Sequence, residues 1–225
     1  MDPGAIDLSD LRLTLQVSFG ATLLCVAIGL PIAWLLARHE FRGKAIVEAL
    51  TTLPLVLPPT VVGFYLLRAA GRSSPVGRFL EDEIGVRLVF TWEGAAIAAA
   101  VLSAPLLIRS AQAGFAEVDP ELERVAATLG RTPLGVFFTI TLPLAIRGVA
   151  AGVGLAFARA AGEFGATVMV AGNIPGRTRT MSVAVYDAVQ AGDFERANAT
   201  ALVLILMSVA SLAVFSWLTF LVRRA

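Results

Sequence analysis

Few side chains in this sequence are of the types that do chemistry together. His39 is the only histidine and Cys25 the only cysteine. A Cys/His metal cluster, a histidine-based catalytic triad and an internal disulfide are therefore all excluded. The carboxylates are scattered and lie mostly in loops, so an intramembrane enzyme would lack its machinery. We predict no catalytic residue and no metal site.

Arg159 and Glu163 stand out because they are ionisable residues within an apolar stretch. Four residues apart, they can face each other along one side of a helix. Ionisable groups at membrane depth are costly and usually face a bundle interior or a wet cavity. A self-neutralising structural pair and a role in a transport path both remain open for them. Just upstream, Gly148 and Gly152 form a small-xxx-small pair that permits close helix packing.

The elements that must position these residues are membrane-spanning helices. Of the 225 residues, 57 % are hydrophobic and 16 % are charged, whereas a soluble domain has about 25 % charged residues. A bilayer core about 30 Å thick requires roughly 20 mostly apolar helical residues. The sequence predicts one all-α polytopic membrane domain over residues 1–225, with a second span broken at Pro54, Pro58 and Pro59. The five spans are expected at about 11–37, 46–68, 93–114, 142–172 and 197–222.

An odd number of spans places the two termini on opposite sides of the membrane. Residues 38–44 contain three basic residues, and Arg223 and Arg224 adjoin the last span. Dense basic flanks favour the cytoplasm, which predicts an external N-terminus and a cytoplasmic C-terminus. The first ten residues contain three aspartates and no Lys or Arg, unlike a signal peptide, so the first span is expected to stay as a helix. The net charge of +1 gives no electrostatic reason to expect nucleic acid as a partner.

A short amphipathic helix is predicted between the third and fourth spans. Asp119 suits its N-cap, Pro120 its first position and Gly130 a left-handed C-terminus. Its apolar face is formed by Leu122, Val125, Ala126 and Leu129. The residues alone leave two interpretations open: a helix lying at the lipid interface, and a knob that docks into a groove on another protein.

The region around this helix resembles the EAA loop of ABC importer permeases. It contains Glu123 and the pair Ala126-Ala127, then Gly130 and, after nine residues, Ile140-Thr141-Leu142-Pro143. In that family the loop is cytoplasmic, and its short coupling helix sits in a cleft of the ATP-binding subunit. The chain departs from the family pattern upstream, where Arg124-Val125-Ala126 stands in place of Glu-Ala-Ala and Glu123 comes one position earlier. The resemblance implies a loop over residues 115–141 whose contacts with the ATPase come from Glu123, Ala126, Ala127, Leu129 and Gly130.

Three further segments resemble the molybdate permease family of these importers: LPLVLPPTVVG at 53–63, GEFGAT at 162–167 and NIPGRTRT at 173–180. The similarity runs from about Leu11 to the last span. It implies a type I ABC importer permease fold and a homodimer with the path at its two-fold axis. It also implies ATPase subunits on the cytoplasmic side and an extracytoplasmic oxyanion-binding protein. Sulfate and tungstate permeases share much of the pattern. The candidates for the path or its gate are Arg159, Glu163, Thr167 and Asn173.

The resemblance also implies that the chain is not an enzyme and binds no cofactor itself. It contains no Gly-x-x-x-x-Gly-Lys-Ser/Thr phosphate loop, so ATP-Mg is expected on the partner subunit. The expected location is the lipid of a prokaryotic cell membrane. The alternative is a secondary transporter driven by an ion gradient, with Arg159 and Glu163 as its coupling site. Such proteins usually show matched broken helices, and the Pro-broken segment occurs once.

Two questions stay open at this stage. Arg177 and Arg179 could attract an oxyanion at the outer mouth or could simply be solvated. Residues 182–190 could also form a short extra helix.

Overall fold

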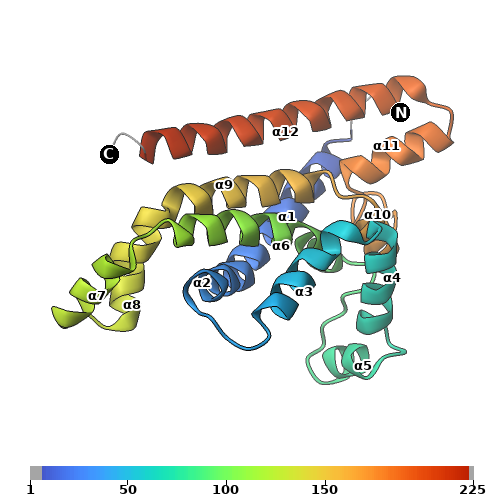
Figure 1. The fold of residues 1–225 in the computed structure, drawn as a ribbon. Helices are drawn as coiled ribbons and strands as arrows, with labels where there is room; N and C mark the ends of the chain where they lie inside the picture. The colour runs from blue at the N-terminus through green and yellow to red at the C-terminus, as the bar shows by residue number, and fades with distance from the viewer. Residues whose placement is uncertain (1–6, 223–225) are drawn as a thin grey trace.

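The computed structural model describes residues 7–222, which form helices joined by turns, without a strand (Figure 1). The prediction of an all-α protein is confirmed for this part of the chain. In chain order the elements are α1 (Leu8–Leu24), the π-helix η1 (Cys25–Gly29), α2 (Leu30–Arg38), α3 (Lys44–Val56), α4 (Pro59–Ala70), α5 (Pro75–Asp82), α6 (Trp92–Ala116), α7 (Pro120–Thr128), α8 (Pro133–Val136), the π-helix η2 (Phe137–Thr141), α9 (Leu142–Ala161), α10 (Gly165–Ala171), α11 (Met181–Gln190) and α12 (Phe194–Val222).

Four helical stretches are long and apolar enough to cross a membrane, and the number reaches the predicted five when α3 and α4, bent by 111° at the break between them, are counted as one broken span. The break lies where it was expected, because α4 begins at Pro59 and a proline has no N–H to continue the preceding helix. The four other stretches that are long and apolar enough to cross a membrane are Leu8–Arg38, Trp92–Ala116, Pro133–Ala161 and Phe194–Phe215.

The fourth span differs from its expected range of 142–172. Its helix begins earlier, because Thr132 caps it by accepting a hydrogen bond from the Gly135 N–H at 3.1 Å. It ends at Ala161, and α10 starts afresh after the break at 162–164. The expected loop over 115–141 is therefore shorter, since residues 133–141 are helical. The prediction from hydropathy was wrong at both ends of this span. Neither an N-cap residue nor a break that contains glycine changes the mean hydropathy of the surrounding sequence.

Helix α6 lies at the centre of the bundle and packs against α9, α1, α2 and α10. Its buried face is rich in alanine, which lets neighbouring backbones come close. A Cβ on Gly148 of α9 would stand 2.7 Å from the Cα of Gly114 in α6. A Cβ on Gly152 would stand 3.0 Å from the carbonyl oxygen of Leu107. The close packing predicted for the Gly148 and Gly152 pair is therefore confirmed.

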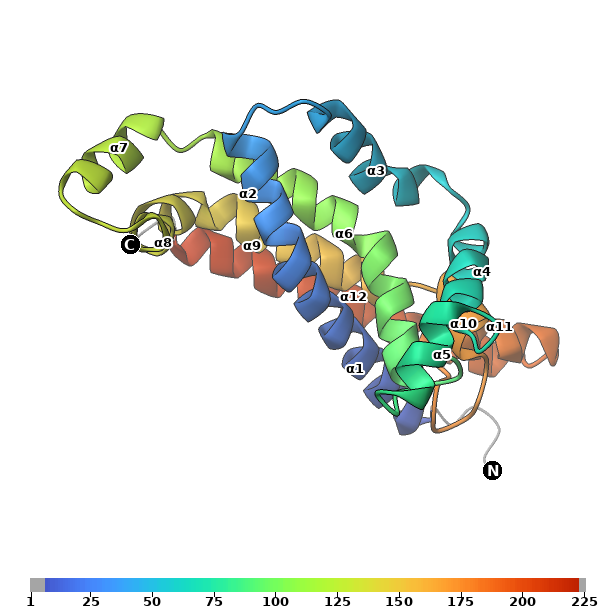
Figure 2. The same ribbon diagram turned by 90° about the horizontal axis from the view of Figure 1, so that it is seen from below.

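The bundle has two distinct ends (Figure 1 and Figure 2). Helices α7 and α8 lie at one end, which we call the α7 end. The start of α1 lies at the opposite end with α5, α10 and α11, and we call this the α11 end. Helix α12 runs from the α11 end back toward the α7 end. The stretch 182–190, which the sequence left open, is helical as part of α11.

Candidate functional site

The chain breaks between α9 and α10, and Glu163 lies buried in that break. Its Oε2 accepts a hydrogen bond from Arg159 Nη1 at 2.7 Å, so the predicted pair forms. Its Oε1 accepts from the Ala166 N–H at 2.9 Å, which places a carboxylate at the N-terminus of α10. The unpaired N–H groups of a first helical turn favour an anion there. Glu163 therefore neutralises Arg159 and also helps to start the next helix.

Two hydroxyl groups satisfy the backbone of the break. Ser182 of α11 donates a hydrogen bond to the carbonyl of Glu163 at 2.6 Å. Thr167 Oγ1 is buried and donates to the carbonyl of Phe164 at 2.9 Å. Irregular backbone at membrane depth is tolerated where it is enclosed by protein and its polar groups are satisfied. Hydrogen bonds from side chains of α10 and α11 therefore stabilise the break.

Helix α4 lies directly against α10. A Cβ on Gly63 would stand 2.7 Å from the Cα of Ala166, and a Cβ on Gly165 would stand 3.0 Å from the Cβ of Pro59. Gly63 leaves no room for a Cβ because its neighbour is backbone, and the space at Gly165 is tighter than that around most Cβ atoms. The proline-rich segment 53–63 and the GEFGAT segment, far apart in sequence, are therefore neighbours in space.

The four path candidates do not all lie together. Arg159, Glu163 and Thr167 meet at the break, and 31 % of the Arg159 side chain is exposed. Asn173 lies on the exposed loop after α10, where its Nδ2 donates a hydrogen bond to Asp187 Oδ1 of α11 at 3.0 Å. Asn173 therefore belongs to the surface of the α11 end.

The 173–180 loop carries a buried ion cluster that the sequence did not predict. Arg179 Nε donates to both carboxylate oxygens of Asp10 at 3.0 Å, and its Nη2 donates to Asp7 Oδ2 at 3.1 Å. Asp187 Oδ2 lies 3.7 Å from its Nη1. Arg179 is neither a solvated residue nor an oxyanion site, so both interpretations of the sequence are wrong for it. Only 8 % of its side chain is exposed, and its guanidinium forms ion pairs with aspartates. Arg177 is exposed.

The charge state of Arg179 follows from these contacts. Burial disfavours the charged form, but the hydrogen bond to Asp10 and the nearby aspartates outweigh it and raise the pKa of Arg179. A signal for the cluster was present in the sequence. Three aspartates near the N-terminus and two arginines in the 173–180 loop were predicted on the same side of the membrane.

At the α7 end, the short predicted helix has the ends that its sequence indicated. Asp119 Oδ1 accepts a hydrogen bond from the Glu121 N–H at 2.9 Å, and Gly130 has a left-handed φ of +85°. Ala127, Leu129 and Gly130 are exposed, and 80 % of Leu129 is accessible. The predicted apolar face also exposes Leu122 and Val125, but its fourth member, Ala126, is buried against the bundle.

Glu123 also faces the bundle. One of its carboxylate oxygens, Oε1, accepts a hydrogen bond from Arg38 Nη2 at 2.9 Å and another from Thr141 Oγ1. Neither partner could be predicted from the sequence, because both are distant from Glu123 along the chain. The five residues predicted to contact the ATPase therefore divide into two inward-facing and three outward-facing residues.

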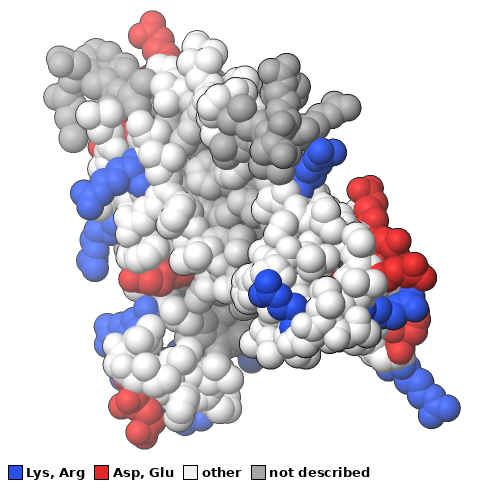
Figure 3. Space-filling model, turned by 90° about the vertical axis from the view of Figure 1, so that its left-hand side faces the viewer, with Lys and Arg blue, Asp and Glu red and all other residues white. Residues whose placement is uncertain are grey.

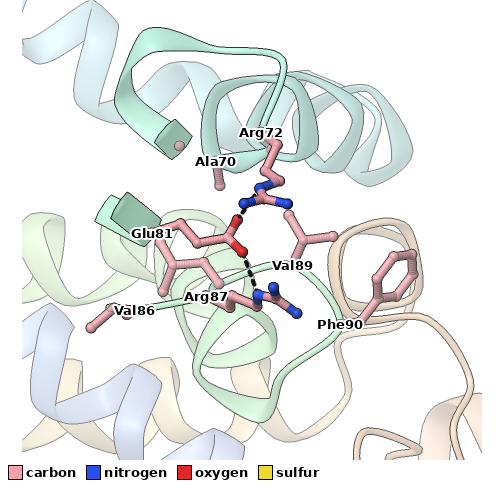
Figure 4. Close-up of a pocket in the computed structure, with 10 residues that line it drawn as sticks. Ala70, Arg72, Glu81, Val86, Arg87, Val89 and Phe90 are labelled. Carbon is pink, nitrogen blue, oxygen red and sulfur yellow. Dashed lines mark hydrogen bonds and ion pairs between the residues drawn. The ribbon is translucent and has the colours of Figure 1, made fainter. Parts of the chain in front are cut away.

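Charged side chains lie on the surface at both ends of the bundle. Seen from the α7 end, acidic and basic residues are interspersed among larger uncharged areas (Figure 3). At the α11 end, a pocket of about 310 Å³ lies beside α5 (Figure 4). Glu81 stands between Arg72 and Arg87 there, and its Oε2 lies 2.9 Å from Arg72 Nε. Because Glu81 neutralises part of their charge, the two arginines do not form an open anion site.

Solved transporters share the fold. The inward-facing MetNI methionine ABC transporter aligns with a TM-score of 0.71 at 17 % identity, covering 96 % of this chain and 95 % of that one. A bacterial alginate ABC transporter in complex with a pentasaccharide-bound periplasmic protein aligns with a TM-score of 0.64 at 16 % identity, covering 92 % and 77 %. Together with the helix arrangement, these likenesses show a type I ABC importer permease fold.

Curated relatives align along nearly the whole chain. The molybdenum transport system permease protein ModB of Escherichia coli K12 is 44 % identical over 213 residues, covering 94 % of this chain and 93 % of the relative. ModB of Haemophilus influenzae is 40 % identical over 215 residues, covering 95 % and 94 %. The sulfate transport system permease protein CysT of Salmonella typhimurium is 36 % identical over 197 residues, covering 88 % and 71 %.

The family described as binding-protein-dependent transport system inner membrane component matches residues 29–225, which include the break, the ion-paired loop and α7. Because this match covers most of the sequence, the chain belongs to the family of binding-protein-dependent transport system inner membrane components.

Proposed function

We propose that this chain is the transmembrane permease subunit of an ATP-driven importer that carries molybdate across the inner membrane. The observation that carries the proposal is the identity of 44 % and 40 % to permeases named for molybdenum transport. The sulfate permease is 36 % identical over a smaller share of its own length, which favours molybdate over sulfate. The family favours an importer over the ion-gradient carrier. The permease itself performs no chemical step.

We propose that the outward face of α7 docks into the ATPase subunit, which binds ATP-Mg. Exposed apolar residues that are rimmed by charged ones mark an interaction surface. Here 48 % of Leu122, 56 % of Val125 and 80 % of Leu129 are exposed, next to charged residues on the same helix. Ala127 and Gly130 belong to this outward face, whereas Glu123 and Ala126 keep the helix seated on the bundle.

The break between α9 and α10 is the proposed gate of the path. Arg159, Glu163 and Thr167 surround it, and the exposed part of Arg159 can meet an anion at the surface that a second copy of the chain would close. Asn173 is the proposed contact at the outer mouth, where an extracytoplasmic binding protein delivers the oxyanion. Nucleotide drives transport only through contacts that differ between the two states of the dimer.

The proposed orientation has the α7 end in the cytoplasm and the N-terminus outside. It is supported by the opposite placement of α7 and the start of α1, and by the course of α12 toward the α7 end. Single cysteines at Leu129 and at Val76 of α5, in a Cys25→Ser background, test it with a membrane-impermeant maleimide in intact cells. Labelling at residue 129 but not at residue 76 would overturn the orientation.

The function is tested by reconstituting the chain with its ATPase and binding protein in liposomes. We expect molybdate uptake that requires ATP and is competed less well by sulfate than by unlabelled molybdate, with tungstate as a second competitor. Uptake by the chain alone under an ion gradient, with no bound ATPase, would instead establish the secondary transporter.

The docking face is tested by co-purification of the ATPase with Leu129→Asp. A charge at this exposed position should lower the recovery of the ATPase without unfolding the permease. Val76→Asp is the matched control, because Val76 is an exposed apolar residue at the opposite end. Equal recovery for both variants would refute the assignment of this face.

A further inference from the structure

Three elements from different parts of the chain meet at the carboxylate of Glu123. Arg38, the last residue of α2, donates to it at 2.9 Å across 85 residues of sequence. Thr141, the last residue of η2 and almost completely buried, donates from the other side. Only 9 % of the Arg38 side chain and 22 % of the Glu123 side chain are exposed. We refer to Arg38, Glu123 and Thr141 as the clasp.

The clasp is the main attachment of α7 to the first span. Ala126 is the only buried residue of α7, and the backbone of this helix packs against α8 and η2. A pocket of about 210 Å³ lies beside Glu123 and is lined by Trp34, Arg131 and Phe137. Since apolar packing is sparse here, the ion pair with Arg38 is what fastens α7 to α2.

The geometry of the clasp leaves one donor unsatisfied. The buried Nε–H of Arg38 has no hydrogen-bond partner within the described residues. A buried donor without a partner lowers stability, and a guanidinium normally uses its fork to bind a carboxylate at two points. Arg38 therefore holds Glu123 through a single contact, at Nη2.

The other end of the first span is also anchored. Residues Leu8–Arg38 form one continuous helical stretch, and Asp10 near its start is paired with Arg179 at 3.0 Å. The loop of Arg179 leads into α11, whose Ser182 holds the carbonyl of Glu163 in the break. The first span therefore joins α7 at one end to the break at the other.

We infer that the clasp is the joint through which a displacement of α7 is passed to the first span, with Arg38 and Glu123 as positioning residues for coupling. This inference rests on the proposed function. Glu123 then acts inside the permease, while the exposed residues of α7 hold the ATPase. The clasp makes α2 follow α7, and the buried pair of Asp10 and Arg179 carries the movement to the gate segment.

The test measures molybdate uptake and ATP hydrolysis together, in liposomes that contain the complete importer. The variants are Arg38→Ala, Glu123→Gln and the charge exchange Arg38→Glu with Glu123→Arg. Arg42→Ala and Glu40→Gln are the controls, because each removes the same charge at an exposed position in the loop that follows α2. Recovery of the ATPase with the purified permease is measured for every variant.

We expect each single clasp variant to retain its ATPase but to lose about tenfold in molybdate transported per ATP hydrolysed, within the ~5–150-fold range of typical coupling between sites. The charge exchange should restore much of that ratio, and the controls should match the wild type. Arg38→Lys, which keeps the charge but not the fork, serves if Arg38→Ala fails to fold. It should show an intermediate ratio.

Three results have distinct meanings. A wild-type ratio in both single variants would overturn the clasp. Loss of ATPase recovery in Glu123→Gln, with recovery kept in Arg38→Ala, would make Glu123 a direct contact to the ATPase and would also overturn it. Absence of ATP-dependent uptake in the wild type would refute the proposed function. This result is distinct from failure of the clasp, which is measured by comparing the variants with an active wild type.

Discussion

Replacement of Arg179 by methionine should destabilise the protein strongly, because among residues 7–222 it removes the only cation in direct contact with Asp10. Of the two side chains, 8 % and 4 % are exposed, so solvent replaces little of what is lost. Breaking a buried pair by removing one partner typically costs about 3–5 kcal/mol. At about 2–4 °C per kcal/mol for a chain of this length, the expected fall in Tm is roughly 6–20 °C.

The neighbouring aspartates give an internal scale for this prediction. Asp187 is 46 % exposed and its oxygen lies 3.7 Å from Arg179, so Asp187→Asn should cost less than about 1 kcal/mol. Asp10→Asn should fall between the two, since it keeps a polar partner for the guanidinium. The double replacement Asp10→Leu with Arg179→Met should recover part of the loss, because a well-packed apolar pair of similar size often replaces a buried ion pair without cost.

The assay is thermal unfolding of the detergent-solubilised protein, followed by the loss of the monodisperse peak in size-exclusion chromatography. Arg177→Met is the control, because Arg177 is exposed in the same loop and should change stability by no more than about 0.5 kcal/mol. Equal Tm values for Arg179→Met and Arg177→Met would refute the reasoning. So would a larger loss in Asp187→Asn than in Asp10→Asn.

Two further predictions follow from local geometry. Gly148→Val should separate α9 from α6 and lower stability by about 1–3 kcal/mol or more, since a Cβ there would lie 2.7 Å from the Gly114 Cα; unchanged thermal unfolding would contradict it. Hydrogen bonds donated by Ser9 hold the pKa of Asp7 below its ordinary value of 3.8. The stability that Asp7 contributes is therefore present above pH 3.8 and is lost as the pH falls through the depressed pKa. The difference in Tm between the wild type and Asp7→Asn should shrink over that acidic range, and a constant difference would count against the assignment.

Features set by neighbouring residues were predictable from the sequence. The N-cap at Asp119, the proline at the first turn of α7 and the left-handed Gly130 each depend on a few adjacent residues, and all three form as expected. The break in the second span was equally predictable, because a proline disrupts a helix whatever residues surround it. Such signals depend little on the tertiary fold.

Features that depend on distant segments were not predictable. Helix α9 ends at Ala161, where Ser182 of α11 and the N-terminus of α10 satisfy the backbone of the break. A hydropathy profile carries no information about such distant hydrogen-bond partners. The burial of Arg179 and its pairing with Asp10 were not predicted, because the two residues are 169 positions apart in the sequence. The π-helices η1 and η2 likewise gave no sign in the periodicity of the sequence.

The packing of α6 and α9 limits how α7 can move. The two long helices touch backbone to backbone at Gly114 and Gly148, and such an interface has little space in which to absorb a displacement. Helix α7 lies in the chain between them, so a force on it from a partner is passed on as movement of the α6 and α9 pair as a unit. The first span packs on the same pair through buried side chains, and Cys25 Sγ donates a hydrogen bond to the Ala100 carbonyl of α6 at 3.3 Å. The ion pairs at Arg38 and at Asp10 add a charged contact at each end of this span. Loss of the Arg38 pair should therefore uncouple the gate from α7, whereas loss of the Asp10 pair should also destabilise the bundle.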